Sequence, residues 1–274
     1  MSATEGRSPA AAPSANGSAR SPAGTTVVVG AAQGIGAGIA RRMAAESWTT
    51  KLVLADIKLD GVEEIAGELG GGEAEVEGMA VDIADAGAVD ELVAASAEAE
   101  RVVFAAGLFA PAPALEVERE EFARIFEVNT EGVFFVAQAY ARAMAERGHG
   151  AIVGVASIAA RMPRMRQTAY CSSKAGMRQA LRVLGMEVAP LGVRVNTVSP
   201  GPTDTPMMRA LAADHSSVDD LAHGSIEAMR PRIPNGRVAR PEDVAAVVSF
   251  LLAPGSEHVM LEDIVVDGGE LLGM

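Results

Sequence analysis

Cysteine is almost absent from this chain of 274 residues, in which Cys171 is the single one. One thiol cannot form an intrachain disulfide framework, and such scarcity is typical of a reducing, cytoplasmic compartment. Basic residues are also few, with 23 Lys and Arg against 36 Asp and Glu and a formal net charge of -13. A nucleic-acid surface needs clustered basic residues, so this balance argues against nucleic acid as a partner.

Long apolar runs are missing as well. No run approaches the roughly 18–20 residues that a membrane-spanning helix needs, so we expect no membrane segment. The first 22 residues are rich in Ala, Ser, Pro and Gly and hold no hydrophobic segment of signal-peptide length. We expect 1–22 to be a disordered tail, because this composition cannot bury enough apolar surface. A transit peptide is the alternative, since the segment is poor in acids.

Aromatic residues make up only 4% of the chain, so Ala, Val, Leu and Ile must fill the core. From residue 23 onward, short apolar runs alternate with longer helical patterns. This alternation predicts one α/β domain over 23–274, a Rossmann-type, doubly wound parallel sheet of seven strands with helices on both faces. The expected strands are 25–30, 51–56, 74–82, 101–106, 151–157, 193–199 and 263–268, and clear helical patterns cover 35–46 and 120–147.

The segment 203–235 departs from this alternation. It is polar, contains Pro206, Pro231 and Pro234, and has weaker periodicity. A long excursion before the last helix–strand unit is typical of a functional segment, so we expect a substrate lid here. A variable surface insertion is the alternative.

The first expected strand ends in GAAQGIG, whose glycines are Gly30, Gly34 and Gly36. Glycines at a strand-to-helix turn let the backbone approach a pyrophosphate, whose charge then meets the helix N-terminus. Asp56 ends the second strand, where a carboxylate can hold a ribose diol and would repel a 2′-phosphate. Because the turn carries Gln33 and no basic residue, the pattern favours NAD over NADP. The alternative for Asp56 is a solvated strand end.

A tyrosine and a lysine stand four residues apart at Tyr170 and Lys174, in a chain with only two tyrosines and three lysines. On a helix this spacing places both side chains on one face. A tyrosine acts as a base near neutrality only if its pKa falls from about 10. A nearby ammonium and an oxidised nicotinamide would both lower it. Ser157 closes an apolar strand just upstream, so the three residues predict a proton-transfer site.

Two weaker signals concern the adenine and metals. Asp82 and Ile83, at the end of the third strand, are expected to frame the adenine. The histidines form no ligand-spaced set with Cys171, so we expect no metal site.

GAAQGIG, the AAG at 105–107, Asn129, Ser157, YCSSK and SPGPTDTPM over 199–207 together resemble the short-chain dehydrogenase/reductase family of the classical type. The likeness covers about 250 residues in the correct order. It implies a homotetramer and the following roles: Tyr170 as acid/base, Lys174 as its pKa modulator and ribose ligand, Ser157 as orienter of the substrate oxygen, and Asn129 as holder of a relay water. The cofactor contacts that it implies or that the residues themselves indicate are Gly30, Gln33, Gly34, Ile35, Gly36, Asp56, Ile57, Asp82, Ile83, Ala105, Gly107, Lys174 and Thr203.

Two residues depart from the family pattern. Val29 replaces the usual Thr before the first glycine of the turn, and Phe104 begins the motif after the fourth strand. The helix between 84 and 99 also looks short. These changes concern supports around the cofactor, so weaker NAD affinity is a possible consequence, while lost chemistry does not follow.

Three arginines, Arg161, Arg164 and Arg166, precede Tyr170 in an otherwise acidic chain. The stretches 156–176, 198–211 and 261–273 resemble the members of the family that oxidise 2,3-dihydro-2,3-dihydroxybenzoate, and Arg164 falls where those enzymes have an arginine after a proline. A guanidinium can hold a carboxylate through two parallel hydrogen bonds. We therefore expect these arginines to bind an anionic substrate, with Met207 covering its ring. The alternative is that all three are solvated loop residues or partners for neighbouring acids.

The resemblance implies NAD-dependent oxidation of the C3 hydroxyl of a carboxylated cyclohexadiene, with aromatisation of the ring, in siderophore or antibiotic biosynthesis. The 2-amino analogue, trans-2,3-dihydro-3-hydroxyanthranilate, is a rival substrate that the sequence does not separate. A generic ketoacyl or alcohol reductase is a second alternative, although it would favour basic residues where Gln33 and Ile57 stand. A nucleotide-sensing regulator without catalysis is the third.

Overall fold

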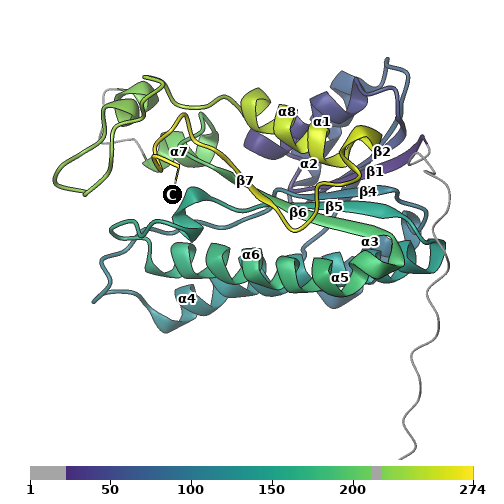
Figure 1. Cartoon of the computed structure of the whole chain (residues 1–274), viewed down its shortest axis with the longest axis horizontal. Helices are drawn as coiled ribbons and strands as arrows, with labels where there is room; N and C mark the ends of the chain where they lie inside the picture. Colours follow the sequence, from purple (N-terminus) through teal and green to yellow (C-terminus); the bar gives the residue numbers. More distant parts are fainter. Residues whose placement is uncertain (1–22, 212–216, 274) are drawn as a thin grey trace, which may run out of the picture.

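The computed structural model describes residues 23–211 and 217–273. The expected tail, 1–22, lies outside the described residues, as do residues 212–216 of the expected lid. Seven parallel strands form one sheet in the order β3-β2-β1-β4-β5-β6-β7, which confirms the doubly wound, Rossmann-type fold (Figure 1). The strands are β1 Gly24–Val29, β2 Thr49–Asp56, β3 Glu75–Ala80, β4 Arg101–Phe104, β5 Gly150–Val155, β6 Val193–Pro200 and β7 Asp263–Val266.

Helices cover both faces of the sheet, as the sequence predicts. The principal helices are α1 Gly34–Ala44, α2 Leu59–Leu69, α3 Ala86–Ala95, α4 Arg119–Phe126, α5 Val133–Arg147, α6 Thr168–Val188, α7 Pro206–Leu211 and α8 Pro241–Leu252. One hydrophobic core joins α1, α2 and α8 to the sheet. A second core joins α3, α5 and α6 to the opposite face (Figure 1). None of the described helices is both long and apolar enough to cross a membrane.

The central strands are apolar because both of their faces are buried. Every residue of β5 and β6 is buried, and in β1 only the first residue, Gly24, is partly open. Continuous apolar runs of this kind are typical of parallel sheets covered on both sides. The strand order reverses between β1 and β4. Ligands of open α/β sheets bind at the carboxyl ends of the strands beside such a reversal, so the fold itself indicates where the site lies.

The helical pattern predicted over 120–147 contains an irregularity that the sequence does not reveal. Between α4 and α5 the chain forms a π-helix, η1, over Glu127–Gly132. A π-helical turn adds one residue to an α-helix and frequently marks a functional site. Asn129, the relay residue expected from the family resemblance, lies within this turn and is fully buried.

The segment expected as a lid has a small core of its own. It contains α7 and the 3₁₀-helix η5 Val218–His223, followed by an antiparallel bridge between Ser225 and Arg230. Its buried apolar residues are Leu221, Ala222, Ile233 and Val238. The C-terminal tail packs on it, because the Asn235 amide donates a 3.0 Å hydrogen bond to the Gly268 carbonyl.

Candidate active site

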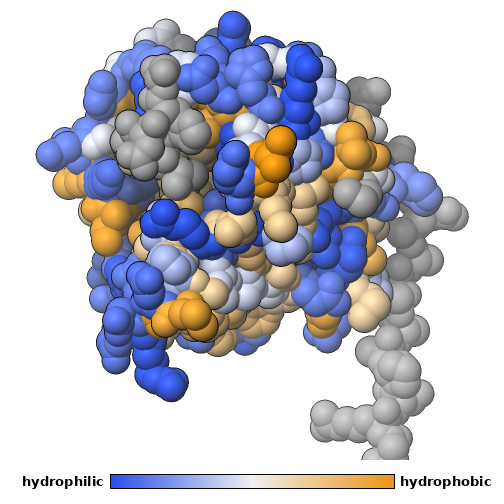
Figure 2. Space-filling model, turned by 90° about the vertical axis from the view of Figure 1, so that its left-hand side faces the viewer, coloured by the Kyte–Doolittle hydropathy of each residue, from blue (hydrophilic) through white to orange (hydrophobic). Residues whose placement is uncertain are grey.

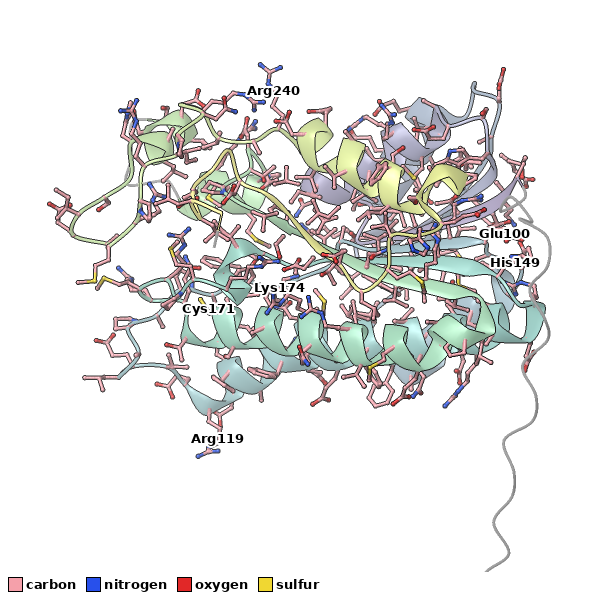
Figure 3. All side chains as sticks on the ribbon, viewed as in Figure 1. Glu100, Arg119, His149, Cys171, Lys174 and Arg240 are labelled. Carbon is pink, nitrogen blue, oxygen red and sulfur yellow. The ribbon has the colours of Figure 1, made fainter. Side chains whose placement is uncertain are left out.

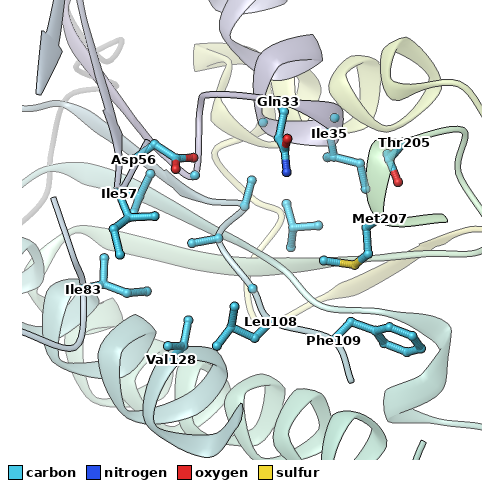
Figure 4. A pocket seen from close by; sticks show the side chains of 18 of the residues that line it. Gln33, Ile35, Asp56, Ile57, Ile83, Leu108, Phe109, Val128, Thr205 and Met207 are labelled. Carbon is cyan, nitrogen blue, oxygen red and sulfur yellow. The ribbon is translucent and has the colours of Figure 1, made fainter. Parts of the chain in front are cut away.

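A cavity of about 380 Å³ opens at the carboxyl edge of the sheet, beside the reversal of strand order. Figure 4 shows that it has two different ends. Asp56, Ile57 and Ile83 lie at one end, while Phe109 and Met207 lie at the other. The first end follows β2 and β3, and the second lies beside the helix that carries the tyrosine and lysine pair.

The backbone of the glycine-rich turn packs so closely on its neighbours that Gly30 and Gly36 could not carry side chains. Gly30 has a φ of 86°, and a Cβ there would overlap the backbone nitrogen of Ala106. A Cβ on Gly36 would overlap the Gly30 carbonyl oxygen. Helix α1 begins here without an acidic residue in its first turn and without a side-chain cap on its N-terminal amides. This cradle and the uncapped helix N-terminus fit the pyrophosphate of a dinucleotide.

Two backbone amides hold the Asp56 side chain, one from the glycine-rich turn and one from the segment that follows β2. Its two carboxylate oxygens accept hydrogen bonds from the amides of Ala32, at 3.1 Å, and Lys58, at 3.0 Å. Lys58 is a cavity residue that the sequence analysis did not single out, and its Nζ lies 3.4 Å from Gln33 Oε1. The expected carboxylate is therefore in place, and an ammonium lies near Gln33 in the same cavity.

Tyr170 lines the cavity, and Phe109 packs edge-on against its ring with the centroids 5.0 Å apart. The Ser157 hydroxyl hydrogen-bonds to the Tyr170 phenol, while its oxygen also accepts from the Ala159 amide at 3.1 Å. Burial raises the pKa of Tyr170, and the bond to Ser157 opposes this effect. In the chain alone the phenol is thus held protonated, so any lowering of its pKa needs further positive charge in the cavity.

Lys174 reaches the same cavity from one turn further along α6. Its ammonium donates a 3.0 Å hydrogen bond to the Val155 carbonyl at the end of β5. Burial lowers the pKa of Lys174 to about 8, so the side chain is still mostly charged at neutral pH. Figure 3 shows Cys171 and Lys174 toward the lid, whereas Glu100 and His149 lie at the opposite end of the molecule.

Asn129 does not line the cavity but supports its wall. Its Oδ1 accepts from the Leu108 amide at 2.7 Å, and its Nδ2 donates to the Leu108 carbonyl at 2.9 Å and to Ser173 Oγ at 3.1 Å. These bonds join the π-helix to the loop after β4 and to α6. The side chain therefore holds together the elements that carry Phe109 and Tyr170.

The three arginines lie in three different surroundings, and none is among the residues that line the cavity. Arg161 pairs with buried Asp263 at 2.8 Å. Arg166 lines a separate, smaller pocket. Arg164 has a side chain only 8% exposed, and its Nη2 lies 2.7 Å from an oxygen of the fully buried Glu270. Pairing with neighbouring acids, the alternative named for these residues, thus describes Arg161 and Arg164.

The structure gathers most of the expected cofactor residues around one cavity. The lining includes Gly30, Gln33, Gly34, Ile35, Gly36, Asp56, Ile57, Asp82, Ile83, Ala105, Gly107 and Lys174, together with Met207 from the expected substrate set. Thr203 is not among the lining residues: it is buried, and its hydroxyl donates to the Gly201 carbonyl at 3.0 Å. Thr205 lines the cavity in its place, two residues later in the same motif.

Sequence reasoning missed several of the residues that line the cavity, and those with polar or aromatic side chains are Lys58, Phe109, Arg124 and Thr205. Phe109 had a signal, because aromatics are few and this one closely follows the motif at 105–107. Within 23–211 and 217–273, no three His, Cys, Asp or Glu side chains gather as a metal site would require.

Comparisons with known proteins agree with this geometry. A family model described as Enoyl-(Acyl carrier protein) reductase matches residues 30–270. The chain is 34% identical to the 2,3-dihydro-2,3-dihydroxybenzoate dehydrogenase of Bacillus subtilis (strain 168), over 90% of this chain and 95% of that protein. It is 36% identical to the D-threitol dehydrogenase of Mycolicibacterium smegmatis, over 89% and 91% of the two chains. A crystal structure described as an NAD(P)-dependent gluconate 5-dehydrogenase of Beutenbergia cavernae, with NADP bound at low occupancy, superposes with a TM-score of 0.82 at 31% identity, covering 92% of this chain and 98% of that one.

Proposed function

We propose, from the premise that the chain belongs to the short-chain dehydrogenase/reductase family of oxidoreductases, that it oxidises the C3 hydroxyl of a dihydro-aromatic carboxylate with NAD. The substrate type is that of 2,3-dihydro-2,3-dihydroxybenzoate, with the 2-amino analogue as the close alternative. The observation that carries this proposal is the cavity itself, which has Asp56 at its nucleotide end and Tyr170, Phe109 and Met207 at the other.

In the proposed mechanism Tyr170 takes the proton of the C3 hydroxyl as the C3–H bond breaks. Ser157 would orient the substrate oxygen, since its hydroxyl already bonds to the phenol. The nicotinamide cofactor, when bound, supplies the acceptor for the hydride that leaves C3. Lys174 stays positively charged near pH 7 and stabilises the tyrosinate. The oxidised ring then loses its C2 proton and becomes aromatic, which favours the forward reaction.

The apolar residues at the reacting end suit a ring rather than an open polar chain. Phe109 and Met207 line the cavity there, and Leu108, between the two ends, adds to its apolar surface. Burial of apolar area contributes roughly 25 cal/mol per Å², so a six-membered ring gains from such walls while a polyol does not. This contrast favours a carbocyclic substrate over the D-threitol of the relative.

The direct test is NADH formation from NAD with each dihydro-aromatic carboxylate, and with D-threitol as the competing polyol. Turnover of either carboxylate at a kcat/KM well above that for D-threitol supports the proposal. Preferred turnover of D-threitol would replace the proposed substrate class, and NAD binding without turnover of any alcohol would support the regulator alternative.

Asp56→Ala should change the cofactor preference. Removing the carboxylate deletes its bonds to a ribose diol and its repulsion of a 2′-phosphate, while Lys58 keeps its charge in the same cavity. We expect kcat/KM for NAD to fall roughly tenfold to a hundredfold, the range for hydrogen bonds to a charged group. The value for NADP should rise. Steady-state kinetics with both cofactors measures the ratio, and Lys58→Met is the matched variant that should depress NADP use alone. An unchanged ratio in Asp56→Ala contradicts this role.

Arg164→Lys should raise KM for a carboxylate substrate. Lysine keeps the positive charge beside Glu270 but loses the planar fork that binds a carboxylate through two hydrogen bonds. We expect KM to rise about tenfold with kcat less affected, measured by initial rates. Arg166→Lys is the control, because Arg166 lies in the separate pocket and its replacement should leave KM unchanged. Equal KM values for the two variants would remove Arg164 from the substrate site.

A further inference from the structure

A buried cluster of charged residues lies where three separate segments meet. Arg164 comes from the loop before α6, Arg230 from the expected lid, and Glu270 from the C-terminal tail after β7. Glu270 is 0% exposed, and its carboxylate interacts with both arginines. Figure 2 shows the side of the molecule toward which the lid and the C-terminal tail project. Hydrophobic side chains appear there among many hydrophilic ones.

The cluster is only partly satisfied by hydrogen bonds. One Glu270 oxygen accepts from Arg164, and the Arg230 guanidinium donates to the Leu221 carbonyl at 2.8 Å. Arg164 Nη1, Arg230 Nε and the second Glu270 oxygen, Oε2, are buried without a hydrogen-bond partner. A buried polar group left in this state is unfavourable, because it has lost its hydrogen bonds to water without gaining others. Two donors and one acceptor therefore await a ligand or water that carries the complementary groups.

Short stretches of chain connect the cluster to residues at the reacting end of the cavity. A backbone hydrogen bond joins Arg164 to the thiol of Cys171, the residue after Tyr170. On the other side, Asp267 of the tail lies against Gly201, where an added Cβ would stand 2.9 Å from the Asp267 Cα. Gly201 directly follows β6, and the chain continues from it to the cavity residues from Thr205 to Met207. The cluster is thus held by segments that are joined to the cavity lining through Cys171 and Gly201.

The charges of the cluster indicate a ligand with no net charge. Arg164 and Arg230 contribute two positive charges, and Glu270 together with Asp267, which is 9% exposed, contributes two negative ones. A ring with a carboxylate and a neighbouring ammonium is likewise neutral overall, whereas its 2-hydroxy counterpart is an anion. Burial raises the pKa of Glu270 and the arginines oppose this, and a substrate ammonium would act in the same direction as the arginines.

We propose that Arg164, Arg230 and Glu270 together bind the adjacent polar substituents of the substrate ring. The unfilled guanidinium N–H groups bind its carboxylate, and the free Glu270 oxygen accepts a hydrogen bond from an amino group on the neighbouring carbon. Glu270 is then the residue that selects a 2-amino over a 2-hydroxy substrate. This inference rests on the proposed function and assigns the substituent that the proposed function leaves open.

The test uses two stable ligands, 2-aminocyclohexanecarboxylate and 2-hydroxycyclohexanecarboxylate, titrated calorimetrically into the protein saturated with NADH. Wild-type protein should bind the amino compound roughly tenfold to a hundredfold more tightly, the range for charged hydrogen bonds. Glu270→Gln keeps an oxygen for Arg164 but replaces the free acceptor with a donor. It should reduce the preference to about onefold. Arg230→Lys, the second variant, should weaken both ligands to a similar extent.

Asp263→Asn is the matched control. Asp263 is another buried carboxylate held by two arginines, Arg161 and Arg178, but it lies at the beginning of β7. This variant should lower the melting temperature and leave the ligand preference unchanged.

An unchanged preference in Glu270→Gln, or tighter binding of the hydroxy compound by the wild type, would overturn the inference. If wild-type protein still oxidises a dihydro-aromatic carboxylate in that case, the proposed function stands and only the role of Glu270 falls. If neither carboxylate is oxidised and neither cyclohexane ligand binds, both proposals fall.

Discussion

Tyr170→Phe is expected to lower kcat by a hundredfold to ten-thousandfold while NAD still binds. The range is that of a lost general acid–base group, since phenylalanine keeps the ring but has no proton to exchange. Ring packing should survive, because the Phe109 and Tyr170 rings pack in a T-shaped arrangement and phenylalanine keeps the ring. Single-turnover kinetics with a dihydro-aromatic carboxylate measures the loss, and fluorescence titration with NADH measures cofactor binding.

Tyr140→Phe is the matched control, because Tyr140 is the other tyrosine of the chain. Tyr140 belongs to α5, and its hydroxyl lies 2.6 Å from Ser96 Oγ at the end of α3, in the core and not in the cavity lining. Losing this bond should lower the free energy of unfolding by about 1 kcal/mol and leave kcat unchanged. A Tyr170→Phe enzyme that retained more than a tenth of wild-type kcat would show that another group moves the proton.

Lys174→Met is expected to abolish turnover and, at the same time, to stabilise the fold at neutral pH. Burial lowers the pKa of Lys174 from 10.5 to about 8, so keeping the ammonium charged inside the protein costs free energy. At 1.36 kcal/mol per pKa unit this cost is about 3 kcal/mol. Methionine removes the cost but leaves the Val155 carbonyl without its donor. We therefore expect a net gain of about 1–3 kcal/mol in the free energy of unfolding.

The pH dependence follows from the direction of this pKa change. Below about pH 8 the lysine is charged in both the folded and unfolded chain, so the folded protein bears the whole cost. Between pH 8 and 10.5 the folded chain loses the proton first, and the advantage of Lys174→Met shrinks until it vanishes. Urea unfolding at pH 7 and pH 10 measures both values.

The surface variant Lys51→Met is the control for this series, because Lys51 forms an exposed ion pair with Glu77. Its free energy of unfolding should change by less than about 1 kcal/mol. A loss of stability in Lys174→Met at pH 7 would show that the hydrogen bond to Val155 outweighs the burial of the charge.

The fold was predictable because its signals are local. Each strand of the sheet is a short apolar run, and each expected strand overlaps an observed one, with differences of a few residues at the ends. The glycine turn and Asp56 were predictable for the same reason, since a strand end, a turn and a helix start follow one another in the sequence. The π-helix over Glu127–Gly132 was not predictable. One extra residue in a helix barely changes the period at which hydrophobic residues recur along the sequence.

The substrate end was less predictable because its contacts are long-range. Arg164 could be picked out as a charge near Tyr170, yet its partner Glu270 lies 106 residues further along the chain. Nothing in the periodicity of either segment pairs them, since both belong to irregular backbone. Thr205 rather than Thr203 lines the cavity, because the chain turns after Gly201 and the Thr203 hydroxyl bonds back to the Gly201 carbonyl. The sequence gives no sign of this turn.

The π-helix also sets a limit on how this chain can gain or lose residues. One residue of an α-helix corresponds to a rotation of about 100°, and the π-helical turn absorbs the residue that it adds without this rotation. Deleting one residue between Glu127 and Gly132 would therefore restore a regular α-helix and keep the buried face of α5, with Val136 and Tyr140, in the core. Asn129 would instead be displaced from Leu108. A single-codon deletion here would thus cost the site its support while leaving the core packed.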